Sequence, residues 1–263
     1  MNDEDLTLKI PIPTTVRQKA KQFAAAQPTP EKAARVYRHT LAVFAAMEYL
    51  QNWLGYDVPE EDSLNPVTRT LSDSADIWIA GIGRIECLVA EPDAETCPLP
   101  PAAQEGRIGY LVVEMPQNKN EDKIEAKQVR LLGFAPMFDP EDVPDEVEWE
   151  ALESLDEMVD YFHRLERGMD ELKKIPSNPE SNPESNPEPD EHQQLMLVAM
   201  LERIYRQEKR NRWGIKAARV LSGSSPELAA VRENNLSGDL VTRQEDAEAL
   251  MQRLANVWQS PPS

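Results

Sequence analysis

The apolar stretch Val36–Leu54 constrains the fold of this chain more than any other part of the sequence. Between Leu41 and Leu50 the only charged residue is Glu48. A helix that is apolar on nearly all of its faces belongs in the interior of a domain. The uncharged run is far shorter than the roughly 20 apolar residues that a membrane-spanning helix needs. The stretch therefore predicts a central, buried helix and no membrane span.

Capping signals set the expected limits of the first helices. Thr29 is expected to cap the central helix, because a proline and a glutamate follow it in the first turn. Gly55 is expected to end that helix. An earlier helix is predicted to run to about Ala26, with Thr14 or Thr15 as its cap.

Five short segments carry the patterns of β-strands. Glycines on both sides of Ile82 predict a hairpin between the second and third segments, and the last two are expected to pair antiparallel. The predicted fold class is α+β, with a small, mostly antiparallel sheet packed on the central hydrophobic helix. The segments are Leu6–Ile12, Asp76–Ala80, Arg84–Val89, Arg107–Glu114 and Gln128–Phe134.

An amphipathic helix is predicted after these strands. Ser154 and Glu157 form a capping-box pattern, and apolar residues then recur at helical spacing until the pattern ends near Lys173. We interpret its apolar face as docking on the sheet of the same domain, and a partner-binding surface is the alternative.

The tetrapeptide Ser-Asn-Pro-Glu occurs three times in residues 177–188. These repeats hold no apolar residue, so they are expected to form a disordered linker. The predicted domains are an α+β domain over residues 1–174, the linker over residues 175–191, and a small all-α module over residues 192–263. The apolar spacing in Leu197–Tyr205 and Ala247–Trp258 supports helices in that last module.

The first of these predicted module helices runs into a basic segment. Between Arg203 and Arg219 the sequence has seven basic residues, one acidic residue and one tryptophan. This segment is the candidate partner-binding site, for an acidic partner or single-stranded nucleic acid. The alternatives are a solvated helix face and a mate for the acidic middle of the chain. The candidate residues are Arg203, Arg206, Lys209, Arg210, Arg212, Trp213, Lys216 and Arg219.

Negative charge is concentrated in the middle of the chain. Residues 139–191 hold 19 acidic and four basic residues, a net charge of −15, whereas the whole chain carries −19. Such acidity repels phosphate, so general nucleic-acid binding is disfavoured and a basic protein partner is favoured. Solubility alone would also account for the charge run.

Reactive and metal-binding side chains are few. With two cysteines and three histidines, none at metal-ligand spacing, no metal or cofactor is expected. A cysteine-dependent enzyme would use Cys87, with Glu86, Asp76 and His39 as neighbours. Cys87 and Glu86 alternate along a predicted strand and point to opposite faces, so we predict that the chain is not an enzyme. Its acidic start is no secretory signal, and a cytoplasmic location is expected.

Several of these segments together resemble a mainly cyanobacterial family known as domain of unknown function 1822. The resemblance covers about residues 6–170 and implies a cyanobacterial source and a role in a regulatory or signalling system. It supplies no catalytic residue. The segment beyond the repeats is expected to be an added or a diverged module. The matching pieces are Leu8–Pro13, Val36–Gly55, Leu64–Pro66, Ser74–Val89, Gly106–Met115 and Leu131–Pro136.

The leading functional prediction is a non-catalytic regulatory or adaptor protein that mediates protein–protein interactions, with a tether between two binding modules. An alternative is a regulator that sequesters a basic transcription factor, such as a sigma factor, through the acidic segment Asp139–Asp160. A cysteine-dependent enzyme is the third possibility. The sequence does not indicate an oligomeric state.

Overall fold

The computed structural model describes residues 7–59, 75–92, 94–116, 126–139, 142–174, 191–207 and 244–259. The chain divides into two compact units. The first unit comprises residues 1–80, 84–136 and 144–155, and the second comprises residues 81–83, 137–143 and 156–263. No helix in the described ranges is long and apolar enough to cross a membrane.

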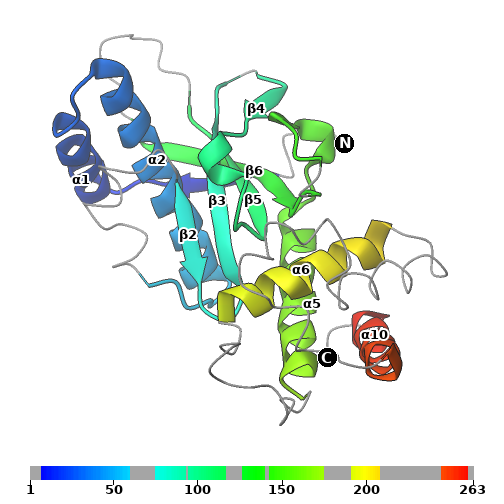
Figure 1. Cartoon of the computed structure of the whole chain (residues 1–263). Coiled ribbons are helices and arrows are strands. Elements are labelled where there is room, and N and C mark those ends of the chain that lie inside the picture. The colour runs from blue at the N-terminus through cyan, green and yellow to red at the C-terminus, as the bar shows by residue number, and fades with distance from the viewer. Residues whose placement is uncertain are drawn as a thin grey trace, which may run out of the picture. The chain divides into compact units, whose positions relative to one another are not determined.

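A five-stranded sheet forms the centre of the first unit, with the strand order β1-β6-β5-β3-β2 (Figure 1). All five predicted strands are present. Strand β6 pairs antiparallel with both β1 and β5, the second pairing as predicted. The strands are β1 (Leu8–Pro11), β2 (Asp76–Ile79), β3 (Gly83–Ala90), β5 (Gly109–Glu114) and β6 (Gln128–Pro136).

The prediction of a mostly antiparallel sheet is wrong, because β3 and β5 pair in parallel. In their register Glu86 lies opposite Tyr110, and Leu88 lies opposite Val112. Parallel neighbours require a crossover connection, and residues 91–108 supply it. The sheet is therefore mixed, and the first unit combines it with helices.

The crossover contains a strand that the sequence did not predict. Strand β4 (Thr96–Pro98) pairs antiparallel with β7 (Glu146–Glu148) to form a separate two-stranded sheet. Neither segment is among the five predicted strands, since three residues are too few to show strand alternation. A short 3-10 turn follows each strand, at Pro101–Ala103 and at Trp149–Ala151.

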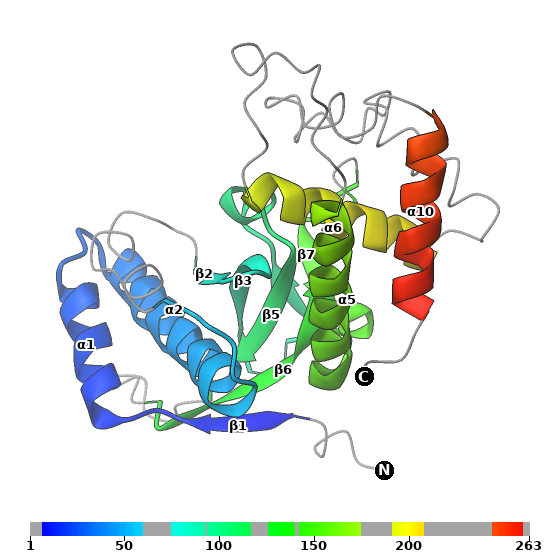
Figure 2. The ribbon, with the colours of Figure 1, turned by 90° about the horizontal axis from the view of Figure 1, so that it is seen from below.

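Two helices complete the first unit. Helix α2 (Pro30–Glu48) contacts β1, β2 and β6, and α1 (Thr14–Ala25) packs along α2 on the side away from the sheet (Figure 2). The Thr29 side chain accepts a hydrogen bond from the backbone N–H of Lys32 at 3.2 Å, so the predicted cap is confirmed. The predicted threonine cap of α1 is wrong, because Pro13 holds that position.

The central apolar stretch is buried as predicted. Ala42, Val43 and Ala45 on α2 are all 0% exposed. The helix continues into a π-helical turn, Tyr49–Trp53, which brings Trp53 to the surface. Gly55 ends the stretch with a φ of 78°, a value that favours glycine.

Three helices of the second unit fall within the described residues: α5 (Leu155–Lys173), α6 (Glu191–Gln207) and α10 (Gln244–Gln259). The Trp258 indole N–H donates to the Arg164 carbonyl oxygen at 2.8 Å, which joins α10 to α5. Gly168 of α5 lies so close to Val198 of α6 that a Cβ atom would approach its Cγ1 to 2.5 Å. These three helices share one core.

The last boundary between the two units along the chain follows residue 155, whereas the sequence placed a domain end at residue 174. Helix α5, which was expected to dock on the sheet of its own domain, makes the contacts just described with α6 and α10. The repeats at residues 177–188 lie outside the described residues, so the predicted linker and the domain limits that depend on it stay predictions.

Candidate functional site

The first unit contains a cavity of about 520 Å³ between α2 and β3. Its helical wall consists of Glu31, Ala34, Arg35, Arg38 and His39. Residues three and four positions apart project from the same side of a helix, and this spacing brings the five side chains to one wall. The volume lies within the range of ordinary ligand pockets.

The opposite wall comes from the sheet and the crossover. It consists of Glu86–Val89 of β3, with Pro98 and Pro100 at the rim. Most of the lining surface is apolar. The cavity is therefore set between a helix and a strand that the core holds in place.

Glu86 contributes a buried carboxylate to the strand wall. Its Oε1 accepts a hydrogen bond from the Ala75 backbone N–H, and its Oε2 accepts one from Arg107 Nε at 3.1 Å. Burial raises the pKa of Glu86, and the Arg107 guanidinium partly offsets that rise. Glu86 and Arg107 are 2% and 7% exposed, so this pair is a fixed part of the interior.

The remaining charges of the wall are largely balanced. Arg38 pairs with the carboxylate of Glu91, which follows β3. Glu31 and Arg35 lie four residues apart on α2, a spacing at which opposite charges attract. The lining therefore offers an apolar surface with no strong excess of either charge.

The structure brings three of the four residues named for cysteine-dependent catalysis to this cavity. His39, Glu86 and Cys87 all contribute to its lining. Asp76 is not part of the lining, and its Oδ2 lies 3.5 Å from Arg84 Nε and 3.9 Å from Arg107 Nη2. Cys87 is 1% exposed, and both carboxylate oxygens of Glu86 already accept hydrogen bonds.

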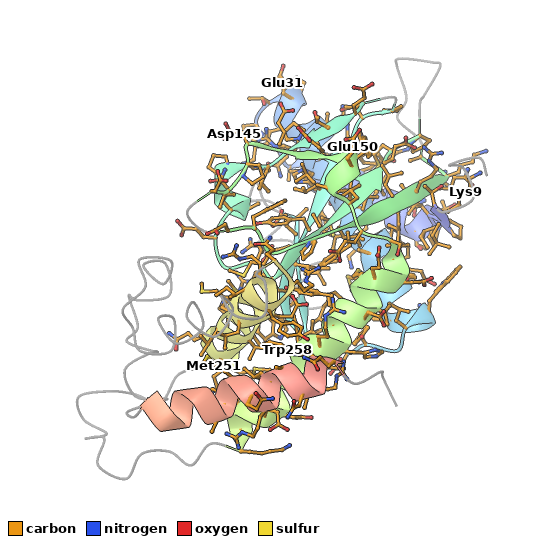
Figure 3. All side chains as sticks on the ribbon, turned by 90° about the vertical axis from the view of Figure 1, so that its right-hand side faces the viewer. Lys9, Glu31, Asp145, Glu150, Met251 and Trp258 are labelled. Carbon is orange, nitrogen blue, oxygen red and sulfur yellow. The ribbon has the colours of Figure 1, made fainter. Side chains whose placement is uncertain are left out.

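A second feature of the first unit is a set of five exposed carboxylates around β4 and β7, which we call the acidic ribbon. The β4–β7 register turns Val147 and Cys97 inward, and it leaves Glu146 and Glu148 exposed. Figure 3 labels two members of the ribbon, Asp145 and Glu150. None of the five forms an ion pair within the described part of the chain. The members are Glu95, Asp145, Glu146, Glu148 and Glu150.

One carboxylate of the ribbon, that of Glu146, also acts on the buried thiol of Cys97. Burial, together with the charges of Glu146 and Glu91, raises the pKa of Cys97 to about 12. A thiol with so high a pKa is protonated at neutral pH and is a poor nucleophile. Cys97 is therefore a packing residue of the small sheet.

Two of the eight predicted partner-binding residues lie within the described residues. Arg203 is 3% exposed, and its Nη1 donates to Asp139 Oδ2 at 2.8 Å. Arg206 Nε donates to Glu202 Oε2 at 3.0 Å. Both charges have partners inside the second unit. Asp139 belongs to the acidic middle of the chain, and pairing of the basic segment with that acidic region was one of the alternatives to partner binding.

The other six predicted partner-binding residues lie outside the described residues, so their role stays a prediction. They are Lys209, Arg210, Arg212, Trp213, Lys216 and Arg219.

The interior of the second unit holds a buried carboxylate of its own. Glu202 is 0% exposed and accepts a hydrogen bond from Arg164 Nε at 2.6 Å as well as that from Arg206. The Arg206 guanidinium lies 5.3 Å from the centroid of the Tyr161 ring. Burial raises the pKa of Glu202 and of Tyr161. The cluster ties α5 to α6.

Sequence reasoning missed Arg35, Arg38 and Arg107 as site residues. The spacing of the first two along α2 was a readable signal, since both fall on one side of a helix. Arg107 gave no signal, because it lies in the crossover and its partner Glu86 is on β3, 21 positions earlier in the chain. In the described ranges, no group of three or more His, Cys, Asp or Glu residues could hold a metal ion.

Comparison with known protein families gives one match. The family described as "Protein of unknown function (DUF1822)" matches residues 10–260, and the chain therefore belongs to this family. The resemblance seen in the sequence covered about residues 6–170, but the match continues to the end of α10, so the C-terminal helices are part of the family and are not an added module. No curated protein and no solved structure matches the chain.

Proposed function

We propose that this member of the DUF1822 family is a non-catalytic regulatory or adaptor protein that binds a basic protein partner through the acidic ribbon. The observation that carries the proposal is the β4–β7 register, which leaves the carboxylates of Glu146 and Glu148 exposed beside three others. A transcription factor with a basic surface, such as a sigma factor, is a partner of suitable charge.

The ribbon has no cation of its own nearby in the sequence. Residues 94–106 and 142–155 contain no Lys or Arg. Neighbouring carboxylates repel one another, and a basic surface that binds them relieves this repulsion. Their negative potential also steers a basic surface toward the ribbon. Backbone hydrogen bonds of the small sheet, such as that from the Leu99 N–H to the Asp145 carbonyl oxygen at 2.8 Å, fix the ribbon in advance.

The adaptor form of the proposal is supported by the division of the chain into two compact units. One unit carries the ribbon and the cavity, and the other carries the basic segment predicted from the sequence. A protein with two separate binding surfaces can hold two partners at high effective concentration.

A charge-reversal experiment tests the proposal. The variant Glu146→Lys/Glu148→Lys is compared with the wild type and with Glu48→Lys/Asp57→Lys, which makes the same charge change elsewhere in the first unit. Each immobilised protein is exposed to native lysate, and retained proteins are identified by mass spectrometry. We expect the wild type and the control to retain the same basic protein and the ribbon variant to lose it.

The dependence on salt gives a second readout. Affinity for the retained partner should fall at least about tenfold between 50 and 300 mM salt, because exposed charges are screened within roughly a Debye length. Equal retention by all three proteins, or binding unaffected by salt, would show that the ribbon is not the docking surface.

A second candidate function, a cysteine-dependent enzyme, is favoured by the presence of His39 and Cys87 in one cavity. A catalytic cysteine must be reachable and ionised near neutral pH. Alkylation of the native protein with iodoacetamide, located by mass spectrometry, decides the point. Rapid modification of Cys87 would favour the enzyme, and resistance until the protein unfolds would exclude it.

A further inference from the structure

We propose that the cavity between α2 and β3 receives an apolar, preferably aromatic, side chain of the basic partner. Lysines or arginines that flank this side chain in the partner contact the acidic ribbon. This inference rests on the proposed function. It adds that an aromatic side chain in the cavity anchors the interface, and that the partner motif is one aromatic residue between basic residues.

The cavity and the ribbon adjoin through a single residue of β4. Pro98 lines the rim of the cavity, and it is also the register partner of Glu146 in the small sheet. The Thr96 hydroxyl donates to Glu146 Oε2 at 2.7 Å, which holds that carboxylate on the ribbon. An extended segment advances about 3.3 Å per residue, so a few residues of a partner can reach both features.

The chemistry of the walls selects an apolar group over an ion. Both carboxylate oxygens of Glu86 already accept hydrogen bonds, and Arg38 is paired with Glu91. Glu31 and Arg35 carry opposite charges on the same helical wall. The lining is therefore close to neutral and mostly apolar, whereas the adjoining ribbon is purely anionic. A ligand that matches both parts combines an apolar body with positive charge beside it.

The cavity has the qualities of an anchor pocket. Its walls are a helix and a strand packed in the core, and Leu88 in the strand wall is only 3% exposed. A pocket formed in advance costs little reorganisation when it is filled. Binding energy in protein interfaces is concentrated in aromatic side chains that enter such pockets, within a polar rim.

Three capped peptides test the motif. The first is Lys-Lys-Ala-Trp-Ala-Lys-Lys, the second replaces Trp with Ser, and the third keeps Trp but replaces every Lys with Glu. Affinity for the full-length protein is measured by fluorescence anisotropy at low salt. We expect the Lys/Trp peptide to bind about tenfold more tightly than the Lys/Ser peptide, because only it fills the cavity. The Glu/Trp peptide should bind most weakly.

Two matched variants distinguish the contribution of the cavity to peptide binding from that of the ribbon. Ala34→Trp fills the cavity from the helical wall, and Ala25→Trp makes the same change at an exposed site on α1. The Lys/Trp peptide should lose its tenfold advantage with Ala34→Trp and keep it with Ala25→Trp. Thermal unfolding of both variants establishes that they are folded.

The outcomes distinguish this inference from the proposed function. If both lysine peptides bind equally to the wild type and are weakened by Glu146→Lys/Glu148→Lys, the ribbon acts alone and the anchor is refuted. If the Lys/Trp advantage survives Ala34→Trp, the aromatic side chain binds elsewhere and the anchor is again refuted. Stronger binding of the Glu/Trp peptide would overturn both proposals.

Discussion

The two units bury a glutamate in different ways. In the sheet unit, Glu86 of β3 is held by one backbone N–H and by Arg107, which is itself buried. In the helical unit, Glu202 of α6 is held by Arg164 and Arg206, whose side chains are 19% and 26% exposed. Burial raises the pKa of both carboxyl groups.

The difference follows from the secondary structure around each group. Ala75 stands at the start of an edge strand, where a backbone N–H remains available to a side chain. In a helix interior every backbone N–H is already used, so a buried carboxylate there must be satisfied by side chains. The sheet unit therefore depends on one buried arginine, whereas the helical unit has two arginines that reach solvent.

The largest expected effect is that of Arg107→Met. The substitution leaves the Glu86 carboxyl group 2% exposed and without its cation, so the free energy of unfolding should fall by about 3–5 kcal/mol. Urea unfolding followed by circular dichroism measures the loss. The control Arg84→Met removes a half-exposed partner of Asp76 and should cost less than about 1 kcal/mol. Similar losses in the two variants would show that burial does not set the cost.

Arg164→Met is expected to have a smaller effect, because Glu202 keeps its hydrogen bond from Arg206. The loss should be about 1–3 kcal/mol, the usual cost of removing one partner of a buried charged group. The same urea titration compares it with Arg107→Met. A loss as large as that of Arg107→Met would show that the second arginine does not protect Glu202 when the first is removed.

The pH dependence of Glu202→Gln sharpens the comparison further. The pKa of Glu202 is raised above its ordinary value of 4.5, chiefly by burial, and Arg206 and Arg164 offset part of that rise. The folded state therefore binds the proton more tightly than the unfolded state, and stability falls as the pH rises above 4.5 toward the folded pKa.

Glutamine has no proton to lose, so Glu202→Gln should gain stability relative to the wild type across that pH window. Unfolding free energies measured in steps upward from pH 4.5 show the trend. A constant difference would mean that the arginines fully offset burial, and a difference that moves in favour of the wild type would mean that they outweigh it.

The smallest expected effect is that of Arg130→Lys at a partly buried pair in the sheet unit, where the Arg130 and Glu114 side chains are 33% and 13% exposed. Arg130 lies opposite Glu114 in the register of β5 and β6, and its Nε and Nη2 donate to the two carboxylate oxygens at 2.6 and 2.7 Å. Lysine keeps the charge but cannot form both bonds, so the loss should be about 0.5–1 kcal/mol. A loss above that of Arg164→Met would contradict the ranking by burial.

Local patterns carried most of the helix predictions. The helix limits at Thr29 and near Lys173 were readable because capping and apolar spacing act within a few residues. The direction of β5 was not readable, because a strand pattern has no polarity and the path of the crossover decides it. The pairing of β4 with β7 joins segments of three residues that lie about 50 positions apart.

The site was only partly readable for the same reason. The helical wall of the cavity follows from spacing along α2, but its strand wall exists only after β3 has joined the sheet. Arg203 looked like a surface cation in the basic run, yet its position on α6 places it beside Asp139. The charge pattern shows that Arg203 belongs to a basic run, but it does not show which carboxylate pairs with it.

Because the crossover from Glu91 to Ile108 carries Pro98 and Pro100 of the cavity lining and Glu95 of the acidic ribbon, recognition can diverge without a change in the strand pairing of the five-stranded sheet. The two parallel strands fix where this segment leaves and returns, and its interior is under no register constraint from them. Family members that serve different partners should therefore differ in composition between residues 94 and 105, with changes in length confined to the stretches on either side of β4, which must keep its pairing with β7.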